Sequence, residues 1–389
     1  MSIDNEFTPR VISYPTFTEL SAILSSHFEI LSSTIEYGMP TFLYRWSSAE
    51  VPKPEVQRKV FDEIHAKADT LNLWSVIRWS DEAQKVYYTR FIPQERQPKS
   101  DIRINYALFI ATLAAIAIGG FLQATSIVFL TLFYPNGYTI WDIAFTTGIF
   151  ILALMGIIGT HEMGHYQMAK RRGIDATPPY FIPGLPQIGG TFGAFIQQKS
   201  PPKDRSALFD LGVAGPYAGF AVTLVALIAG FLLSVPVTAE QIAAIDNTFP
   251  GMSGGLPVPY LFVILELFFG GLVPPGGTIY LHPVGFAAWV GCLVTALNLF
   301  PAGQLDGGHA LRAIIDEKKQ KYIGFGAIAV MFLLGFYLMA ILVLALGAAG
   351  GHPGALDDTV PVTKSRVIIF IVAMIILALS IPPLGLTLF

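Results

Sequence analysis

The sequence predicts a membrane protein that is all-α in the bilayer, with six transmembrane helices and a short membrane-associated β segment, preceded by a small soluble α+β domain. Hydrophobic residues make up 53% of the 389 residues and charged residues 13%, whereas a soluble domain carries about 25% charged residues. Charges are frequent before residue 100, and long apolar runs follow it. A net charge of −3 without a basic tract argues against nucleic acid as a partner and leaves the lipid bilayer as the expected surroundings.

The first hundred residues, 1–100, have the pattern of a small α+β domain. Residues 36–45 and 85–92 are rich in aromatic and β-branched types, which predicts strands. Residues 54–70 carry apolar side chains at helical spacing, which predicts a helix between those strands. The polar segment 93–101 is interpreted as a linker. The sequence assigns no role to this domain.

The membrane domain, residues 101–389, contains apolar runs close to the ~20 residues that a helix needs to cross the hydrocarbon core. A weaker run at 258–273 holds Glu266 and is bounded by prolines, so we interpret it as interfacial or re-entrant rather than as a seventh span. The six predicted spans are residues 105–122, 143–165, 208–233, 284–300, 324–348 and 366–388.

The distribution of charge predicts the orientation of these spans. The connections 123–142 and 234–282 contain no Lys or Arg, whereas basic residues gather between the second and third spans and after the fourth. The positive-inside rule then places both termini in the cytoplasm, although Lys364 and Arg366 fall on the outer side of this arrangement. The initial segment MSIDNEFTPR resembles neither a secretory signal nor an Arg-rich transit peptide, so we expect a prokaryotic cell membrane.

The second predicted span ends in GTHEMGHYQMAKRRG (159–173), which contains HExxH. His161 and His165 are four residues apart, so a helix presents both imidazoles on one face, about 6 Å apart along its axis. Such a pair can bind zinc with a third ligand and leave one position for water. Glu162 can act on that water as the general base. HExxH also arises by chance, but ionisable residues inside an apolar span usually serve a function.

The third ligand is expected from Asp306 in NLFPAGQLDGGHA (298–310). The alternative role of this carboxylate is to cap the helix that begins near His309, since Asp is a preferred N-cap. With six spans, Asp306 and the HEMGH motif both lie at cytoplasmic ends and so at one membrane depth. We therefore predict a metal site of His161, His165 and Asp306, and interpret His309 as a helix-start residue or a donor to a ligand.

HEMGH followed far downstream by NLFPAGQLDGGH resembles the site-2 protease family of intramembrane zinc metalloproteases. The likeness extends through GGTFGAFI (189–196), SALFDLGVAGPYAG (206–219) and HPVGFAAWVG (282–291), and covers most of residues 140–315. The sequence most resembles the branch that contains prokaryotic members and chloroplast homologues. Many members of the family carry a PDZ domain, and no PDZ-like insertion is recognised in this sequence.

The resemblance implies a zinc metalloendopeptidase that cuts within or near the transmembrane segment of a single-span membrane-protein substrate, as in regulated intramembrane proteolysis. In the family, the HExxH histidines and the LDG aspartate bind one Zn²⁺ ion, which corresponds here to His161, His165 and Asp306. The HExxH glutamate is the base, which corresponds to Glu162. Asn298 matches an asparagine for which the family suggests contact with the substrate.

A helical substrate hides its carbonyls in backbone hydrogen bonds and must unwind before it is cut. The segment PQIGGTFGAFIQQ (186–198) alternates β-type residues with glycines, which favours a strand whose edge pairs with an extended substrate. Gly190 and Gly193 are therefore candidate substrate-binding residues, and a glycine-rich re-entrant turn is the alternative. Two other functions stay open for the whole chain: a membrane metal transporter, and a catalytically inactive relative that binds membrane proteins.

Overall fold

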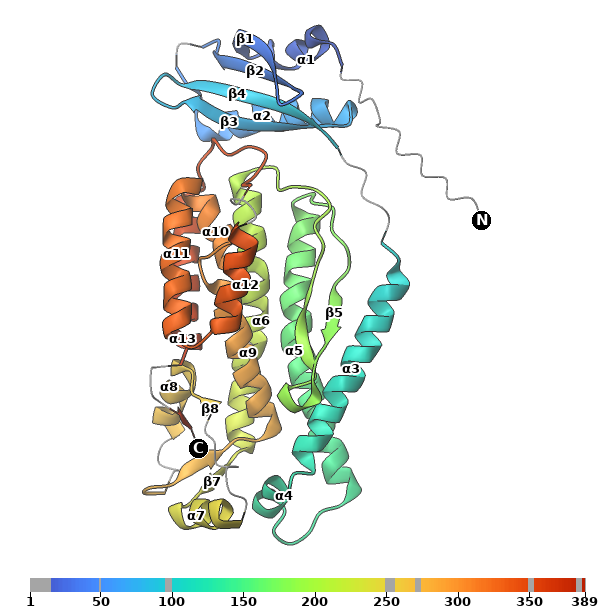
Figure 1. Cartoon of the computed structure of the whole chain (residues 1–389), viewed down its shortest axis with the longest axis vertical. Helices are drawn as coiled ribbons and strands as arrows, with labels where there is room; N and C mark the ends of the chain where they lie inside the picture. Colours follow the sequence, from blue (N-terminus) through green and yellow to red (C-terminus); the bar gives the residue numbers. More distant parts are fainter. Residues whose placement is uncertain are drawn as a thin grey trace, which may run out of the picture. The chain divides into compact units, whose positions relative to one another are not determined.

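The computed structural model describes residues 15–48, 50–94, 100–248, 256–269, 274–348, 353–382 and 387–388. The chain divides into two compact units, whose secondary structure is drawn in Figure 1. Unit 1 comprises Met1–Pro98, Pro201–Arg205 and Ala355–Pro361. Unit 2 comprises Lys99–Ser200, Ser206–Gly354 and Val362–Phe389.

Unit 1 is an α+β structure in which an antiparallel sheet of order β1-β2-β4-β3 packs against two helices. Its core is largely aromatic, and Phe42, Tyr44 and Phe61 are fully buried. Buried and more exposed residues alternate along β3 and β4, as expected for a sheet with one covered face. The bounds are α1 Phe17–Leu24, β1 Phe28–Glu36, β2 Met39–Trp46, α2 Pro54–Thr70, β3 Leu73–Asp81 and β4 Val86–Pro93.

Two short segments from distant parts of the sequence extend this sheet beyond β3. The Ile77 amide donates to the Leu356 carbonyl at 2.8 Å, and the Leu356 amide donates to the Pro202 carbonyl at 2.8 Å. A parallel bridge joins Ile77 to Asp357. Val360 is buried in the aromatic core. Unit 1 is therefore completed by residues that lie far along the chain.

The predicted helix at 54–70 is confirmed as α2, and the two predicted strands overlap β2 and β4. The strand expected at 36–45 begins too early, because Tyr37 and Gly38 form the β1–β2 turn with φ of +52° and +77°. Two consecutive residues with positive φ are typical of a tight hairpin turn. The elements α1, β1 and β3 were not predicted from the sequence, and residues 95–99 of the expected linker lie outside the described residues.

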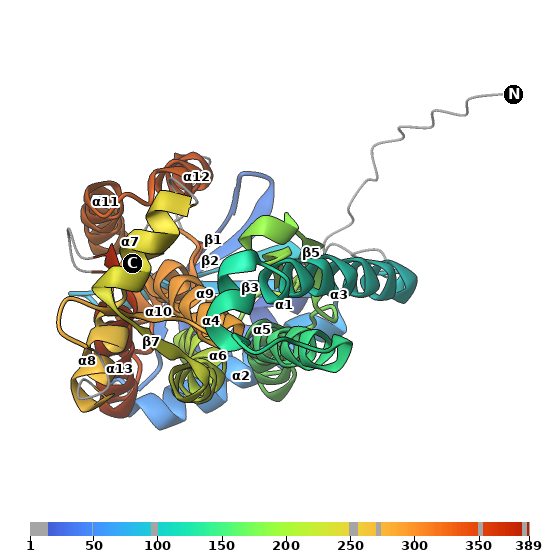
Figure 2. The same cartoon turned by 90° about the horizontal axis from the view of Figure 1, so that it is seen from below.

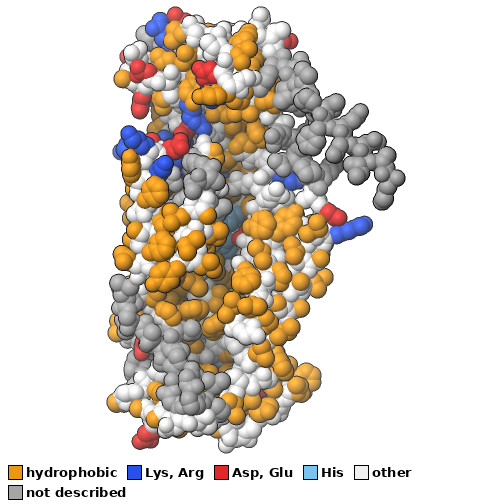
Figure 3. Space-filling model, in the orientation of Figure 1, with side chains coloured by type: hydrophobic (Ala, Val, Ile, Leu, Met, Phe, Trp, Pro, Cys, Tyr) orange, Lys and Arg blue, Asp and Glu red, His pale blue; other side chains and the backbone are white. Residues whose placement is uncertain are grey.

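Unit 2 is mostly helical. Its helices α3 (Ile102–Ala124), α5 (Ile140–Arg171) and α6 (Arg205–Leu233) are long and apolar enough to cross a membrane. The shorter apolar helix α9 (Pro283–Leu299) runs beside them, as Figure 1 shows from the side and Figure 2 along the helix axes. Hydrophobic side chains cover much of the surface of unit 2 in Figure 3, and many are strongly exposed. The chain is a multi-pass membrane protein.

Shorter elements connect these helices. Three small antiparallel ladders pair β5 with β6, β7 with β9 and β8 with β10. The bounds are α4 Ile127–Phe133, β5 Tyr180–Pro183, η1 Pro186–Ile188, β6 Thr191–Phe195, β7 Val235–Val237, α7 Ala239–Thr248, β8 Leu256–Pro257, α8 Tyr260–Phe269, β9 Thr278–Tyr280, α10 Asp306–Ile314, α11 Glu317–Leu333, α12 Tyr337–Ala348, α13 Lys364–Ser380 and β10 Thr387–Leu388.

The predicted set of six spans is not confirmed, and the span expected at 324–348 is wrong as a single helix. It covers the second half of α11 and the whole of α12, which a turn at Gly335 separates. Gly335 has φ of +85°, its amide donates to Phe332, and the Phe336 amide donates to Met331. This pair of bonds is the Schellman end of a helix. Because α12 then packs back against α11, the two form a helical hairpin.

An ion-pair cluster places the start of α13 at the basic end of unit 2. Arg366 pairs with Asp210 of α6, which also pairs with Arg172 at the end of α5. Arg366 therefore lies with the other basic residues, and its conflict with the predicted orientation is removed by the hairpin before it. The predicted span 366–388 is also too long, because α13 ends at Ser380.

The opposite end of unit 2 carries α7 and α8 (Figure 1), which belong to the stretch 234–282, where the sequence has no Lys or Arg. Its apolar run at 258–273 contains α8, whose 10 residues are too few to cross a core of ~30 Å. Leu256 of β8 in this stretch pairs with Leu388 of β10. The strand β10 therefore lies beside β8, away from the end of unit 2 that carries Arg366.

Candidate active site

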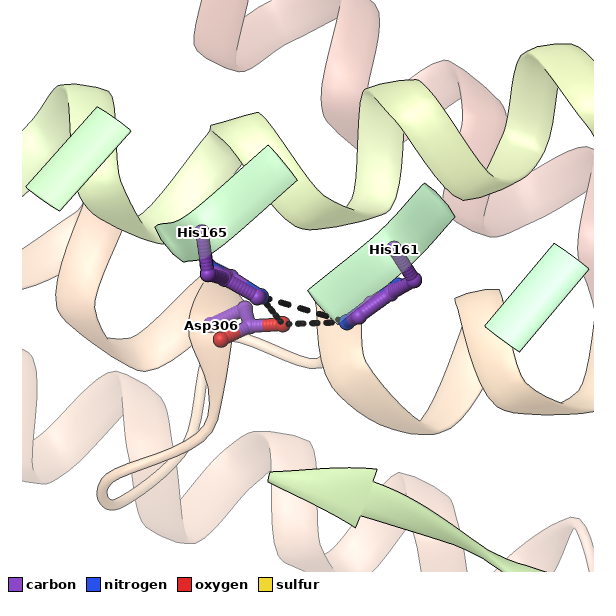
Figure 4. A group of neighbouring side chains, drawn as sticks. All are labelled: His161, His165 and Asp306. Atoms are coloured by element: carbon purple, nitrogen blue, oxygen red, sulfur yellow. Dashed lines mark hydrogen bonds and ion pairs between the residues drawn. The ribbon is translucent and has the colours of Figure 1, made fainter. Parts of the chain in front are cut away.

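The two histidines of HExxH extend from one face of α5 toward Asp306 (Figure 4). The Nε2 atoms of His161 and His165 are 3.2 Å apart. The Asp306 Oδ2 atom is 3.3 Å from His161 Nε2 and 3.1 Å from His165 Nε2. Both histidines are buried, and the Asp306 side chain is 17% exposed. The structure thus brings the three predicted metal ligands together.

Asp306 reaches the histidines from the first turn of α10. Its alternative role as a helix cap is not found, because Leu305 is the N-cap and no side chain caps the helix there. The glycines that follow let the chain turn closely over its own backbone. A Cβ at Gly307 would lie 2.0 Å from the Leu299 carbonyl oxygen, and one at Gly308 would also meet backbone atoms.

The spacing of the three donor atoms fits zinc. Zinc bonds of ~2.0–2.1 Å to histidine nitrogen and carboxylate oxygen place the ligand atoms of a tetrahedron ~3.3–3.4 Å apart. The observed separations of 3.1, 3.2 and 3.3 Å are close to that value. Two imidazoles and one carboxylate are also a donor set of catalytic zinc sites, which keep a fourth position for water. Within the described part of the chain, this is the one group of side chains with such an arrangement.

A backbone carbonyl fixes the orientation of His165. Its Nδ1 lies 2.9 Å from the Leu211 carbonyl oxygen of α6. Because a carbonyl only accepts hydrogen bonds, Nδ1 carries the hydrogen and donates it. The Nε2 lone pair then faces Asp306 and His161, where a metal ion would bind. Histidines that bind metals are commonly held in this way, which also makes the ligand more basic.

A row of glycines in α6 makes room for the ligands. A Cβ at Gly215 would lie 2.1 Å from His165 Nε2, and one at Gly219 would lie 3.0 Å from His161 Cβ. A Cβ at Gly212 would lie 2.8 Å from the backbone oxygen of Asp306. Residues three and four apart share one face of a helix. This face of α6 therefore packs directly against all three metal ligands.

The ligands border a cavity of about 250 Å³ that also contains Glu162. Ile196, just after β6, lines the same cavity as Glu162. β6 pairs with β5, and none of the described strands pairs with its other edge. A hollow with histidine and acidic atoms inside it is visible between hydrophobic surfaces in Figure 3. The cavity is lined by His161, Glu162, His165, Ala194, Phe195, Ile196, Gln198, Leu211, Gly212, Asn298, Gln304, Asp306 and His309.

Comparison with known proteins identifies the family. The model of peptidase family M50 matches residues 149–342, which include His161, His165 and Asp306. Residues 149–342 of the chain belong to peptidase family M50. The "Probable zinc metalloprotease EGY1, chloroplastic" of Oryza sativa subsp. japonica is 33% identical over 192 residues, which are 49% of this chain and 30% of that protein. Its namesake from Arabidopsis thaliana is 33% identical over 174 residues, which are 44% of this chain and 30% of that protein.

A second M50 relative gives a longer match. The "Probable zinc metalloprotease EGY2, chloroplastic" of Arabidopsis thaliana is 31% identical over 226 residues, which are 56% of this chain and 38% of that protein. The chain therefore matches only 30–38% of the length of these relatives. No solved structure matches it. The M50 homology and the donor set agree on zinc as the metal of this site.

The M50 site does not contain every residue that the sequence predicted. Glu162 and Asn298 line the cavity with the metal ligands, whereas Gly190 and Gly193 are not among its lining residues. Gly190 packs closely on α3, because a Cβ there would lie 2.5 Å from the Ala115 backbone. The Gly193 amide donates to the Thr191 hydroxyl. A role of both glycines in substrate binding stays a prediction.

Three polar groups of the M50 site escaped the sequence analysis. Gln198 and Gln304 line the cavity, and the Leu211 carbonyl holds His165. Gln198 closes the glycine-rich segment and Gln304 lies two residues before Asp306, so their position beside a motif was an available signal. The Leu211 carbonyl gives no signal in the sequence, because every residue has one.

Proposed function

We propose that this protein is a zinc metalloendopeptidase that hydrolyses a peptide bond within or near a transmembrane segment of a membrane-protein substrate. One observation supports this above all: His161, His165 and Asp306 meet at zinc spacing in a cavity that also holds Glu162. The exposed apolar surface of unit 2 agrees with a site inside the bilayer. The chloroplast relatives named as probable zinc metalloproteases are consistent with the same chemistry.

Each residue of the site has a defined part in this reaction. When zinc is bound, it lowers the pKa of a coordinated water to about 7 and polarises the scissile carbonyl. Glu162 accepts a proton from the attacking water and delivers it to the leaving amine nitrogen. His161 and His165 act as neutral ligands, and Asp306 contributes a negative charge without moving protons. The Leu211 carbonyl keeps His165 in the tautomer that binds the metal.

The substrate is proposed to bind as an extended strand. Ala194 and Phe195 of β6 line the cavity together with Ile196, and none of the described strands pairs with the other edge of β6. A substrate segment paired with this edge would present its carbonyls to the metal. Gly190 and Gly193 would shape the strand, and Asn298 would contact the substrate from α9. Because a helical segment must unwind first, substrates with Gly, Pro or Asn near the cut should be cleaved faster than versions with Leu.

The proposed setting is a prokaryotic cell membrane, with single-span proteins as substrates and release of a tethered regulator as the outcome. The named relatives are chloroplast proteins. For the orientation, we propose that the basic end of unit 2, with Arg172 and Arg366, faces the cytoplasm. The C-terminal strand β10 would then lie on the opposite side, because it pairs with β8. This revises the prediction that both termini are cytoplasmic.

Neither alternative function gains support from the site. A metal transporter would be expected to carry further groups of ligands along a path, and the described residues hold one such group. An inactive relative would be expected to lack the base, whereas Glu162 is present in the cavity. A peptidase accounts for the metal ligands and the carboxylate together.

Cleavage of a labelled single-span substrate by the purified protein in lipid vesicles tests the proposal. We expect cleavage that a zinc chelator stops and added zinc restores, and a loss of about 10²–10⁴-fold in rate for Glu162→Gln, as is typical for removal of a general base. Glu240→Gln, at an exposed carboxylate of α7, is the control and should cleave normally. Cleavage that survives both chelation and Glu162→Gln would exclude a metallopeptidase.

A further inference from the structure

A partly buried cluster of ion pairs joins three helices of unit 2 near the metal ligands. Asp210 of α6 accepts two hydrogen bonds from Arg366 of α13, from Nε at 2.8 Å and from Nη2 at 2.9 Å. Arg172 at the end of α5 donates to the same carboxylate. The Asp210 side chain is 17% exposed and that of Arg366 is 19% exposed. Two parallel bonds between a guanidinium and a carboxylate fix both distance and direction, which a single contact does not.

This cluster stands next to the hydrogen bond that orients His165. Asp210 precedes Leu211, whose carbonyl accepts the Nδ1 hydrogen of His165 at 2.9 Å. Arg172 is the C-cap residue of α5, the helix that carries His165. The cluster and the carbonyl therefore connect α5 to α6 at two neighbouring points. Arg366 of α13 binds the same Asp210 carboxylate, so the position of Leu211 depends on three helices.

We propose that Asp210 is a positioning residue for the metal centre, which it serves by holding the Leu211 carbonyl against His165 with the help of Arg172 and Arg366. The proposal rests on the metal site of the proposed function. Asp210 is not among the residues that line the cavity, whereas Leu211 is, so Asp210 acts through Leu211. Without the carboxylate, the second turn of α6 loses its ion pairs with Arg172 of α5 and Arg366 of α13, and the His165 imidazole loses its fixed orientation.

A second α6–α13 contact supplies a control for simple helix packing. The Tyr217 hydroxyl donates to the Ile369 carbonyl at 2.6 Å, and Tyr217 lies almost two turns beyond Asp210. Tyr217→Phe removes this bond and leaves the Asp210 cluster in place. Exposed basic neighbours supply two further controls, Arg171 beside Arg172 and Lys364 beside Arg366.

Metal affinity of the full-length protein in detergent micelles tests the proposal without any substrate. The metal-free protein is titrated with cobalt, whose absorption in the visible region reports the coordination geometry, and zinc affinity is then measured by displacement. Loss of a group that orients a metal ligand costs about 10–100-fold in affinity. We expect about a tenfold loss for Asp210→Asn and Arg366→Ala, with an altered cobalt spectrum. Asp210→Glu keeps the charge and should recover part of the loss.

The controls separate positioning from general stability. Tyr217→Phe, Arg171→Ala and Lys364→Ala should bind zinc as the unchanged protein does, whatever their effect on the thermal midpoint of the metal-free form. Excess zinc should return peptidase activity to Asp210→Asn but not to Glu162→Gln. Asp210→Asn with normal zinc affinity and a normal cobalt spectrum would overturn the proposal, even if its midpoint falls. An unchanged protein that binds zinc but cleaves nothing would overturn the proposed peptidase function and leave the role of Asp210 intact.

Discussion

The metal centre of unit 2 and the aromatic core of unit 1 are built on opposite packing principles. Around the metal ligands, space is set by glycines, and a single added carbon at Gly215 would lie 2.1 Å from His165 Nε2. In unit 1, space is filled by large rings, with Phe28 stacked on Phe61 at 6.1 Å between centroids. Adding one carbon atom near the metal ligands should therefore abolish metal binding. The aromatic core of unit 1, by contrast, should lose stability only when a large part of a ring is removed. Substitutions in both directions test this contrast.

The largest effect is expected for Gly215→Ala. The new methyl group overlaps His165 and either turns the imidazole away or separates α5 from α6, so zinc binding and cleavage should fall by about 100-fold, the upper end of the range for loss of a group that orients a metal ligand. Gly159→Ala is the matched control, because Gly159 lies on α5 near His161 and a Cβ there meets nothing within 4 Å. Zinc content by atomic absorption distinguishes the two. Normal zinc content in Gly215→Ala would contradict the close packing of α6 on the site.

Phe61→Ala should have the opposite signature. Removing this fully buried ring should cost unit 1 about 3–5 kcal/mol of unfolding free energy and leave zinc affinity unchanged. Denaturant unfolding followed by tryptophan fluorescence suits the measurement, since Trp46, Trp74 and Trp79 belong to unit 1. Tyr37→Ala, at a side chain in the β1–β2 turn that is 88% exposed, should change the free energy by less than about 0.5 kcal/mol. Loss of zinc from Phe61→Ala would show that the two units are not independent.

A smaller, pH-dependent effect is expected at Asp357. Burial raises the pKa of this carboxyl from 3.8 to about 6, and the neighbouring carboxylates of Asp204 and Asp358 act in the same direction. The folded state therefore prefers the protonated form, so this group stabilises unit 1 at low pH and the stabilisation is lost as pH rises through 6. A shift of about two units corresponds to about 3 kcal/mol.

Asp357→Asn should therefore be more stable than the unchanged protein at pH 7.5 by up to about 3 kcal/mol, with the difference shrinking as pH falls from 6 toward 4. His65, whose pKa burial lowers to about 4, destabilises unit 1 as pH falls. Its contribution is common to both proteins and cancels in the difference. Chemical denaturation at several pH values gives the result, and a difference that does not vary with pH would count against a buried ionised carboxylate.

The smallest effect is expected at the α11–α12 turn. Gly335→Ala meets no atom within 4 Å but must adopt φ of +85°, which costs about 1–2 kcal/mol. Gly326→Ala, in open space inside α11, should instead stabilise the helix by up to about 1 kcal/mol. Opposite changes in thermal midpoint are the expected outcome. Equal changes would argue against the helical hairpin.

The metal site could be predicted from the sequence because its chemistry is encoded locally. Helical spacing alone puts His161 and His165 on one face, and Asp306 stood out as a carboxylate in an apolar region. The surroundings of the site could not be predicted in the same way. The need for Gly215 arises from the distance between two helices, and the role of Leu211 comes from a backbone atom that all residues share.

The fold was predictable where the pattern was long and regular, as for α3, α5 and α6. The prediction of a single helix at 324–348 failed, because a hydropathy average does not register Gly335. One residue with positive φ is enough to reverse the chain. The sequence also did not predict that Ala355–Pro361 belongs to unit 1. Only a few residues of this segment pair with β3, from which they are separated by about 280 positions in the sequence. Such short strands carry too little pattern to be distinguished from a loop.

The discontinuity of unit 1 has a consequence for biosynthesis. Its sheet is not complete until Leu356 and Val360 have been made, long after the strands β1 to β4. Until then β3 presents an unpaired edge, which can pair with another nascent chain. A polypeptide that stops after the first hundred residues contains every strand of the four-stranded sheet. It should nevertheless keep the unpaired edge of β3 and self-associate.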